Sequence, residues 1–243
     1  MIRKERPHKA RALTDAVDRL PRLADKAVGK SSDSMTNSAI NDQEPAFIEV
    51  GEGNTARRIA VRARLGASPG LIWLGGFNSD MTGTKAVALD AWAAERGRAC
   101  VRFDYSGHGE SGGAFIDGTI GRWLEESVAV FERFCRGTQV VIGSSMGGWM
   151  ALLLAREIAR RQLGRASLAG LVLIAPAPDF TEQLMWNGFP PEVREEIRTR
   201  GVWMRPSQYG DPYPITRALI EEGRNHLLLG SAIDVGCPVR ILQ

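Results

Sequence analysis

The chain has 243 residues, of which 44% are hydrophobic and 24% charged, and these values are ordinary for a globular protein with one sizeable domain. Its net charge of +3 is concentrated at the start, because residues 1–34 hold nine basic and five acidic side chains (+4) and the remainder holds 22 basic and 23 acidic ones (−1). The balanced remainder argues against a nucleic-acid partner, and no apolar run is long enough to span a membrane.

The first 34 residues differ from the rest of the chain. A short helix over residues 10–23 is expected there, followed by a polar run at 30–34. We expect residues 1–34 to be a disordered or non-native extension and residues 35–243 to form the folded domain, with an organelle-targeting arm as the alternative. The absence of a secretory h-region predicts a cytoplasmic, bacterial-type location. The three cysteines cannot all pair and have no metal-ligand spacing, which favours a reducing compartment.

Alternating strand and helix patterns follow from residue 47. The expected elements are an antiparallel strand pair at 47–50 and 58–65, a strand at 71–74, a helix capped by Thr84 that runs to Arg96, a strand at 99–104, a helix capped by Thr119, a strand at 139–142, a helix at 149–163 and a strand at 168–174. This order predicts an α/β fold with a mostly parallel, doubly wound sheet that is covered on both faces.

Residues 176–213 interrupt this alternation of strands and helices. Prolines recur there, and they interrupt a stretch with many large apolar side chains, among them Trp186, Phe189 and Trp203. An apolar insertion directly after a sheet strand predicts a helical lid whose aromatic side chains bind substrate. Surface helices that pack their aromatic side chains on the core are an equally good interpretation. A helix over 215–229 and a strand at 239–242 are expected to follow.

The most informative motif is Gly143-Ser144-Ser145-Met146-Gly147, which lies between an apolar strand and an apolar helix. G-x-S-x-G at such a corner is typical of a nucleophile elbow, the turn that lifts a serine hydroxyl clear of the sheet edge. Ser145 has glycine two residues before and two residues after it, where neighbouring chains pass too close for a Cβ. Ser145 is therefore the predicted nucleophile, and a chance glycine-rich turn is the alternative.

A serine nucleophile needs an oxyanion hole, a base and an orienting acid. The N–H of Met146, directly after the nucleophile, is one expected oxyanion donor. The other is the N–H of Phe77, which follows the glycine pair Gly75-Gly76 at the end of a strand. A tight turn without a catalytic role is the alternative for this glycine pair.

The base and the acid are not assigned by position. In this arrangement the acid and then the histidine follow the nucleophile. His8 lies in the extension, and His108 precedes the nucleophile and is expected in a loop near the pocket rim. His226 is expected at a helix end, where it would interact with the last carbonyl groups. Asp179 follows the strand at 168–174 and is either an acid or the cap of the next helix.

Five ordered motifs resemble one branch of the α/β-hydrolases, that of the mitochondrial depalmitoylase also described as an acyl-glucuronide esterase, and its bacterial relatives. They are GTKA at 83–86, ACVRFDYSG at 99–107, GSSMGGW at 143–149, GVW at 201–203 with PS at 206–207, and CPVRIL at 237–242. The resemblance covers residues 47–243. It implies that Ser145 is the nucleophile, that the substrates are acyl esters or thioesters, and that neither a metal nor an organic cofactor is used.

The same resemblance raises an expectation about the end of the chain. In that branch, the equivalent of Ile241-Leu242 is followed by the catalytic Asp, a last strand, the catalytic His and a final helix. We therefore expect the chain to stop before these elements. The predicted function is a serine hydrolase of small-molecule acyl esters or thioesters, and a catalytically inactive relic with a retained ligand pocket is the alternative.

Overall fold

The computed structural model describes residues 44–161, 163, 165–207 and 210–243. The predicted extension at residues 1–34, including His8 and the helix expected at 10–23, lies outside the described residues.

Seven strands form one sheet in the order β1-β2-β4-β3-β5-β6-β9. They are β1 Ala46–Val50, β2 Arg57–Arg64, β3 Ala67–Leu74, β4 Arg98–Phe103, β5 Gly137–Ser144, β6 Ala166–Ile174 and β9 Val239–Leu242. The pairs β1–β2 and β2–β4 are antiparallel, whereas β4, β3, β5, β6 and β9 run parallel to one another. The predicted antiparallel pair and the mostly parallel sheet are therefore confirmed.

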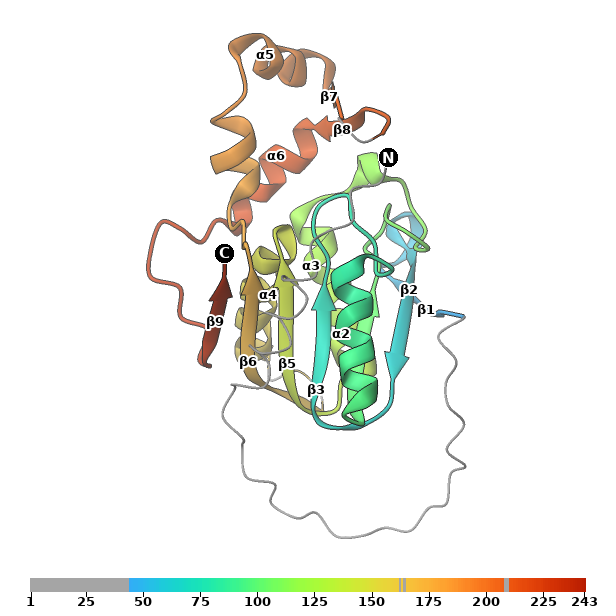
Figure 1. Ribbon diagram of the computed structural model, residues 1–243. Coiled ribbons are helices and arrows are strands. Elements are labelled where there is room, and N and C mark those ends of the chain that lie inside the picture. The colour runs from blue at the N-terminus through green and yellow to red at the C-terminus, as the bar shows by residue number, and fades with distance from the viewer. Residues whose placement is uncertain (1–43, 162, 164, 208–209) are drawn as a thin grey trace.

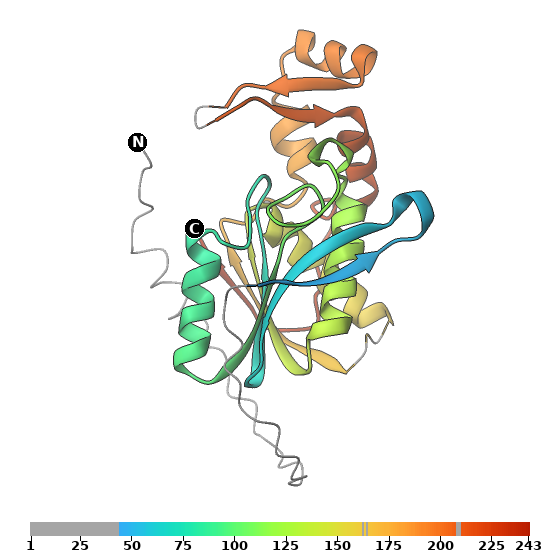
Figure 2. The ribbon, with the colours of Figure 1, turned by 90° about the vertical axis from the view of Figure 1, so that its right-hand side faces the viewer.

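Helices cover both faces of the sheet. The helix α2 (Thr84–Glu95) lies on one face, and α3 (Ile120–Phe134) and α4 (Met146–Arg161) lie on the other (Figures 1 and 2). Side chains of β3 alternate between the two faces, because successive residues of a strand point in opposite directions. Leu71 and Trp73 join the buried cluster under α2, and Ile72 and Leu74 join the larger cluster under α3 and α4.

Local signals explain where two of these helices begin. The hydroxyl of Thr119 accepts a hydrogen bond from the N–H of Arg122 at 3.3 Å, which confirms the predicted cap of α3. Thr84 is instead the first residue of α2, and its cap position is occupied by Gly83, which has no side chain to make a cap bond. The expected cap at Thr84 is therefore wrong by one residue.

The helix α4 begins at Met146, three residues before the predicted start. A Cβ on Gly148 would lie 2.7 Å from Cβ of Pro176, so the first turn of this helix packs directly against the chain that leaves β6. This close approach accounts for glycine in a helical turn that propensity alone disfavours.

The segment between β6 and β9 stands beyond the carboxyl ends of the strands (Figure 1). It contains the π-helix η3 Thr181–Trp186, α5 Pro191–Arg200, the strands β7 Val202–Arg205 and β8 Tyr213–Thr216, α6 Arg217–Gly223 and the 3-10 helix η4 Arg224–His226. We name residues 181–216 the upper segment. The antiparallel pair of β7 and β8 was not predicted, because prolines flank and interrupt it. Pro214 is accommodated opposite Met204 in a sheet of only two strands.

The helix predicted over 215–229 is shorter in the structure. Ile215 belongs to β8, and the hydroxyl of Thr216 accepts a hydrogen bond from the N–H of Leu219 at 3.0 Å, which fixes the start of α6. The strand expected at 239–242 is confirmed as β9, next to β6.

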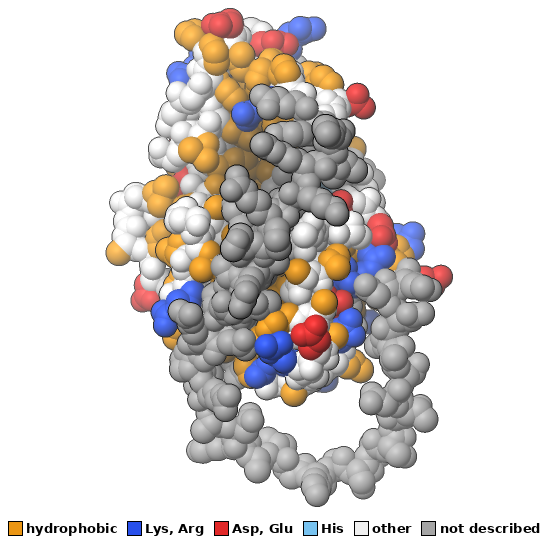
Figure 3. Space-filling model, viewed as in Figure 1, with side chains coloured by type: hydrophobic (Ala, Val, Ile, Leu, Met, Phe, Trp, Pro, Cys, Tyr) orange, Lys and Arg blue, Asp and Glu red, His pale blue; other side chains and the backbone are white. Residues whose placement is uncertain are grey.

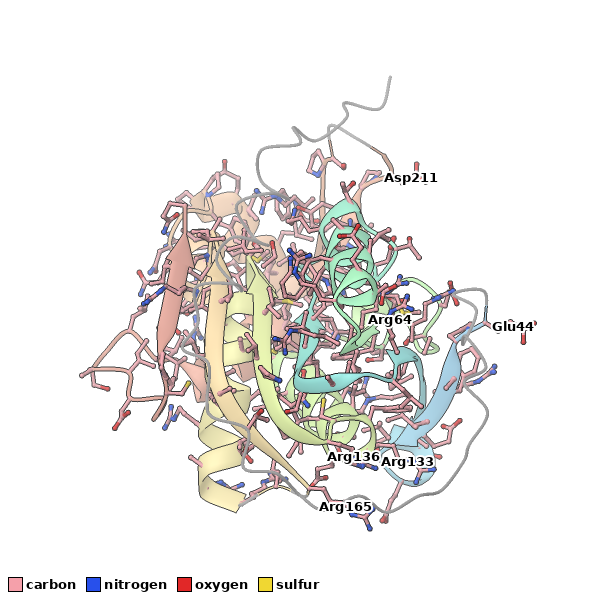
Figure 4. The ribbon with its side chains drawn as sticks, turned by 60° about the horizontal axis from the view of Figure 1, so that its bottom comes forward. Glu44, Arg64, Arg133, Arg136, Arg165 and Asp211 are labelled. Carbon is pink, nitrogen blue, oxygen red and sulfur yellow. The ribbon has the colours of Figure 1, made fainter. Side chains whose placement is uncertain are left out.

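Arginines gather at the opposite end of the sheet, where β5 and β6 begin (Figure 4). Arg136 donates hydrogen bonds to the carbonyl groups of Glu132 and Cys135, the latter at 2.7 Å, and so satisfies the end of α3. The N–H of Gly137 donates to the carbonyl of Arg165 at 3.0 Å. Basic side chains are favourable at helix carboxyl ends, so this charge is explained by helix termination.

Candidate active site

Ser145 occupies the corner between β5 and α4. Its backbone has a φ of +55°, and the residue is exposed although its neighbours on both sides are buried. A left-handed conformation costs a non-glycine residue about 1 kcal/mol, and such strain persists only where the surrounding structure enforces it. The strand, the corner and the helix therefore have the form that the sequence predicted for an elbow.

Close backbone contacts enforce this corner. A Cβ on Gly143 would lie 2.1 Å from the carbonyl oxygen of Gly147, and a Cβ on Gly147 would lie 2.0 Å from the carbonyl oxygen of Leu74. Real Cβ atoms do not approach other atoms so closely. Both glycines of the motif are thus required by packing of the main chain.

Hydrogen bonds tie the Ser145 backbone to the end of β6. Its N–H donates to the carbonyl of Ile174 at 3.0 Å, and its carbonyl accepts from the N–H of Ala177 at 3.1 Å. The N–H of Gly148 donates to the same carbonyl at 2.9 Å. Ser145 therefore connects three parts of the fold through its main chain and leaves its side chain exposed.

The loop after β3 runs beside Ser145. A Cβ on Gly76 would lie 3.3 Å from the carbonyl oxygen of Ser144 and 3.6 Å from Cβ of Ser145. Phe77 follows Gly76 directly. On the other side of the serine, Met146 is the first residue of α4, where N–H groups have no partner within the helix. The structure thus brings the segments of both predicted oxyanion donors to Ser145.

The Phe77 ring is held between the sheet domain and the upper segment. Its centroid lies 5.0 Å from that of Phe115 and 6.0 Å from that of Trp123, both before the elbow in sequence. It also lies 5.5 Å from the ring of Phe180 and 5.9 Å from that of Tyr213 in β8. Aromatic contacts of this geometry favour a fixed ring, so Phe77 is anchored from several directions.

The three aromatic residues predicted to bind substrate all belong to or pack against the larger core cluster, but their rings have different neighbours. The rings of Phe189 and Trp203 are in contact, with centroids 5.2 Å apart. The ring of Trp186 is instead surrounded by the guanidinium groups of Arg194, Arg198 and Arg224, at 5.7, 5.3 and 5.3 Å from its centroid. Guanidinium groups at these distances from a ring make cation–π contacts. The ring contacts therefore pair Phe189 with Trp203 and place the Trp186 ring among arginines, although the N–H of Phe189 donates to the carbonyl of Trp186 at 3.4 Å.

Apolar side chains are prominent on the upper segment. In the space-filling view apolar side chains gather above the sheet, and charged side chains lie both at the top of the molecule and along its lower edge (Figure 3). Leu184 and Met204 belong to this segment and are exposed by 65% and 49%. An exposed apolar surface beyond the carboxyl edge of an α/β sheet is a frequent place for an apolar ligand.

Neither described histidine has a hydrogen bond to Ser145. His108 is buried, and its Nε2 accepts from the N–H of Asn78 at 3.3 Å. His226 is half-buried, and its Nε2 lies 2.6 Å from Oε1 of Glu222. Among the described residues, the Ser145 hydroxyl therefore has no histidine partner.

Asp179 has a role that the sequence did not indicate. Its carboxylate is buried and accepts hydrogen bonds from the N–H groups of Leu228 and Leu229, both at 2.8 Å. The following π-helix has Phe180 at its cap position and no side-chain cap bond, so the expected helix cap at Asp179 is wrong. Asp179 connects the entry of the upper segment to the chain that leaves it.

Asp104 joins two loops of the fold, a role that sequence reasoning missed. Its buried carboxylate accepts from the N–H of Met81 at 2.6 Å and from the N–H of Glu110 at 2.8 Å. It thereby joins the loop after β3 to the loop after β4. Burial raises the pKa of this carboxyl, although the backbone hydrogen bonds act against the shift. The available signal was its place in the D-Y-S-G-H-G-E sequence, directly after a strand.

No group of three or more His, Cys, Asp or Glu side chains in the described ranges could hold a metal ion. In the same ranges, no helix is both long enough and apolar enough to cross a bilayer.

Comparisons with known proteins agree with this geometry. Residues 66–233 match the model of the Alpha/beta hydrolase family. The mitochondrial palmitoyl-protein thioesterase ABHD10 of Homo sapiens is 38% identical over 187 residues, which are 76% of this chain and 59% of the human protein. The chain thus spans about three fifths of the length of the curated relatives it matches.

Two solved structures are similar over most of the chain. A protein of Agrobacterium vitis S4 with a provisional assignment as a hydrolase is 48% identical, with a TM-score of 0.78 over 82% of this chain and 77% of that protein. The α/β-hydrolase domain-containing protein 10 from mouse is 33% identical, with a TM-score of 0.66 over 81% of this chain and 76% of the mouse chain.

Proposed function

Because the chain belongs to the α/β-hydrolase family, we propose that it is a serine hydrolase that cleaves acyl esters or acyl thioesters through an acyl-enzyme on Ser145. The observation that carries this proposal is the exposed Ser145 at a φ of +55°, held by close backbone contacts at the corner between β5 and α4. A strained and exposed serine at this corner is the arrangement from which a hydroxyl can attack an acyl carbonyl.

The proposed reaction begins with attack of the Ser145 hydroxyl on the acyl carbonyl. The N–H groups of Met146 and Phe77 then donate to the oxyanion, and each such donor typically stabilises the transition state by about 3 kcal/mol. The alcohol or thiol leaves, and water hydrolyses the acyl-enzyme. Neither His108 nor His226 accepts the hydroxyl proton in this arrangement, since the Nε2 atoms of both are bonded elsewhere.

An acyl thioester with a long acyl chain is the substrate that we favour. The human relative is named a palmitoyl-protein thioesterase, and it shares 38% identity with this chain. The paired rings of Phe189 and Trp203, together with the anchored Phe77, provide apolar surface for an acyl chain. The ring of Trp186 has three arginines around it and is therefore the least apolar of these surfaces.

The proposed partner is thus a small acyl substrate, with no nucleic acid. We further propose a cytoplasmic location in a bacterial-type cell. The mitochondrial name of the human relative supports an organelle as the alternative, and fractionation of cells that express the tagged chain would separate the two.

Labelling with a fluorophosphonate probe tests the proposed nucleophile. We expect the full chain to be labelled and Ser145→Ala to lose the label. Ser144→Ala is the matched control, because Ser144 is the adjacent, largely buried serine at the end of β5 and should leave labelling intact. A label that survives in Ser145→Ala, or disappears equally in both variants, would contradict the assignment.

A catalytically inactive relic is the second candidate. It is favoured by one observation, namely that neither described histidine is hydrogen-bonded to Ser145. A relic would be folded by circular dichroism and would bind palmitate, yet the probe would not label it. Measured turnover of p-nitrophenyl palmitate that depends on Ser145 would exclude this candidate.

A further inference from the structure

His108 has hydrogen-bond partners that fix the position of its proton. Nδ1 lies 3.1 Å from the carbonyl oxygen of Ser106, which can only accept, so Nδ1 carries the proton. Nε2 lies 3.3 Å from the N–H of Asn78, which can only donate, so Nε2 supplies its lone pair. Both partners thus require one tautomer, the neutral imidazole protonated at Nδ1.

The bond to Asn78 supports the loop beside the nucleophile. Asn78 has a φ of +55°, a left-handed conformation, and it directly follows Phe77, whose N–H is the proposed oxyanion donor. Gly76, one residue before Phe77, is the residue that approaches Ser145. The hydrogen bond from Asn78 to His108 therefore fixes the main chain one residue beyond the proposed donor.

The imidazole is enclosed by rings. Those of Phe115, Trp123 and Tyr105 lie 5.0, 5.3 and 5.8 Å from its centroid. Such an enclosure disfavours the imidazolium, and burial lowers the pKa of His108, although the bond to the Ser106 carbonyl and the charge of Asp80 act against the shift.

The charged groups of the surrounding elements have other partners. Asp80, in the loop after β3, accepts from the N–H of Thr82 at 2.7 Å. Asp104, at the end of β4, accepts from two backbone N–H groups, and Glu126 of α3 accepts from the N–H of Ser106 at 2.9 Å. Among the described residues, none of these carboxylates is hydrogen-bonded to the imidazole, so the neutral form is the one that the surroundings favour.

We propose that His108 is a positioning residue which, as the neutral Nδ1–H imidazole, holds the loop at residues 75–78 in the conformation that presents the Phe77 N–H to the oxyanion. Protonation of Nε2 places a second donor opposite the N–H of Asn78, so the hydrogen bond is lost and the loop is released. The effect on reactivity rests on the proposed function, whereas the tautomer and the loop contact do not.

The direction of the pH effect follows from the lowered pKa. In the unfolded chain His108 has the ordinary histidine pKa of about 6.5, and in the folded chain its pKa lies below this value. Between the two values the unfolded state binds more protons, so the free energy of unfolding decreases as the pH falls through this window. Above it, the loop contact is fully present.

Long-range proton–nitrogen NMR of the full chain, labelled at histidine, tests the contact without any need for activity. We expect one imidazole with its proton on Nδ1 at neutral pH, which is assigned by its loss in His108→Gln and which titrates below the ordinary histidine value. A proton on Nε2, or an ordinary titration, would overturn the proposal.

The rate at which a fluorophosphonate probe labels Ser145 tests the consequence. His108→Gln keeps an acceptor but cannot titrate. We therefore expect a labelling rate within about threefold of wild type at pH 8, and a smaller fall of this rate than in wild type as the pH is lowered. His108→Phe keeps a ring without an acceptor and should label up to about 10²-fold more slowly at every pH, the size expected for a displaced oxyanion donor. His226→Gln, the half-buried histidine bonded to Glu222, is the control and should match wild type.

The two tests separate the two proposals. If folded wild type is not labelled at any pH, the proposed function fails, and the NMR result alone decides the role of His108. If wild type is labelled and both His108 variants match it in rate and pH profile, the positioning role is overturned while the nucleophile stands. Equal loss in His108→Gln and His108→Phe, with unchanged melting temperature, would also overturn it, because the acceptor would then be irrelevant.

Discussion

The elbow and the upper segment are held in place in opposite ways. At the elbow, main-chain atoms meet main-chain atoms, and Gly143 and Gly147 leave no room for a Cβ. In the upper segment, side chains make contacts such as that between Phe189 and Trp203, and a Cβ on Gly210 would meet nothing within 4 Å. The difference indicates that the elbow tolerates almost no substitution, whereas the upper segment can change its side chains and keep its fold.

The largest effect is expected from Gly147→Ala. The added methyl would lie 2.0 Å from the carbonyl oxygen of Leu74, so α4 would have to move away from β3. We expect a loss of about 3 kcal/mol in the free energy of unfolding, at the upper end for overpacking, together with loss of probe labelling. Denaturant unfolding measures the change in the free energy of unfolding. Gly210→Ala, in open space, is the matched control, and a similar loss there would remove the contrast between the two regions.

Substitution of two buried aspartates, one in each region, is expected to have an intermediate effect on the free energy of unfolding. Asp104 and Asp179 each accept two backbone hydrogen bonds, one near the proposed oxyanion loop and the other at the entry of the upper segment. Replacing either by Asn removes one acceptor and adds a donor, which should cost about 2 kcal/mol. Only Asp104→Asn should slow labelling of Ser145. Equal slowing in both variants would show that the upper segment also controls the nucleophile.

A smaller effect on stability is expected from Trp203→Ala. Loss of the half-buried ring and its contact with Phe189 should cost about 1 kcal/mol. If the ring contacts the acyl chain, kcat/KM for p-nitrophenyl palmitate should fall about tenfold, and that for the butyrate ester less than about twofold. Trp186→Ala is the control, since its ring lies among arginines. A tenfold fall with both esters would contradict acyl-chain binding by Trp203.

The smallest effect has the opposite sign. Ser145→Gly removes a strained left-handed residue, and the relief of about 1 kcal/mol is partly offset by the greater freedom of glycine in the unfolded chain. We expect a net gain of about 0.5 kcal/mol, seen as a small rise in melting temperature, with complete loss of labelling. Ser144→Gly, in extended β5, should instead lower the melting temperature. A fall in both variants would argue against strain at the elbow.

Local sequence was sufficient where short-range geometry decides the structure. The elbow follows from glycine spacing, the start of α3 from its cap residue Thr119, and β9 from an apolar run, and all three signals act within a few residues. The start of α4 at Met146 and the pairing of β7 with β8 were missed, because close contact with Pro176 and pairing across a proline-rich loop outweigh local propensity.

The sequence alone determined the α/β-hydrolase architecture and the corner at which Ser145 stands, because both depend on periodicity and on a motif of five adjacent residues. Only the tertiary structure decided what the isolated polar and aromatic residues do. His108 is bound by Asn78, and Asp179 is bound by Leu228 and Leu229. The ring of Trp186 is contacted by three arginines. Most of these partners lie tens of residues away in sequence, so no local pattern contains the hydrogen bonds and ring contacts that fix their roles.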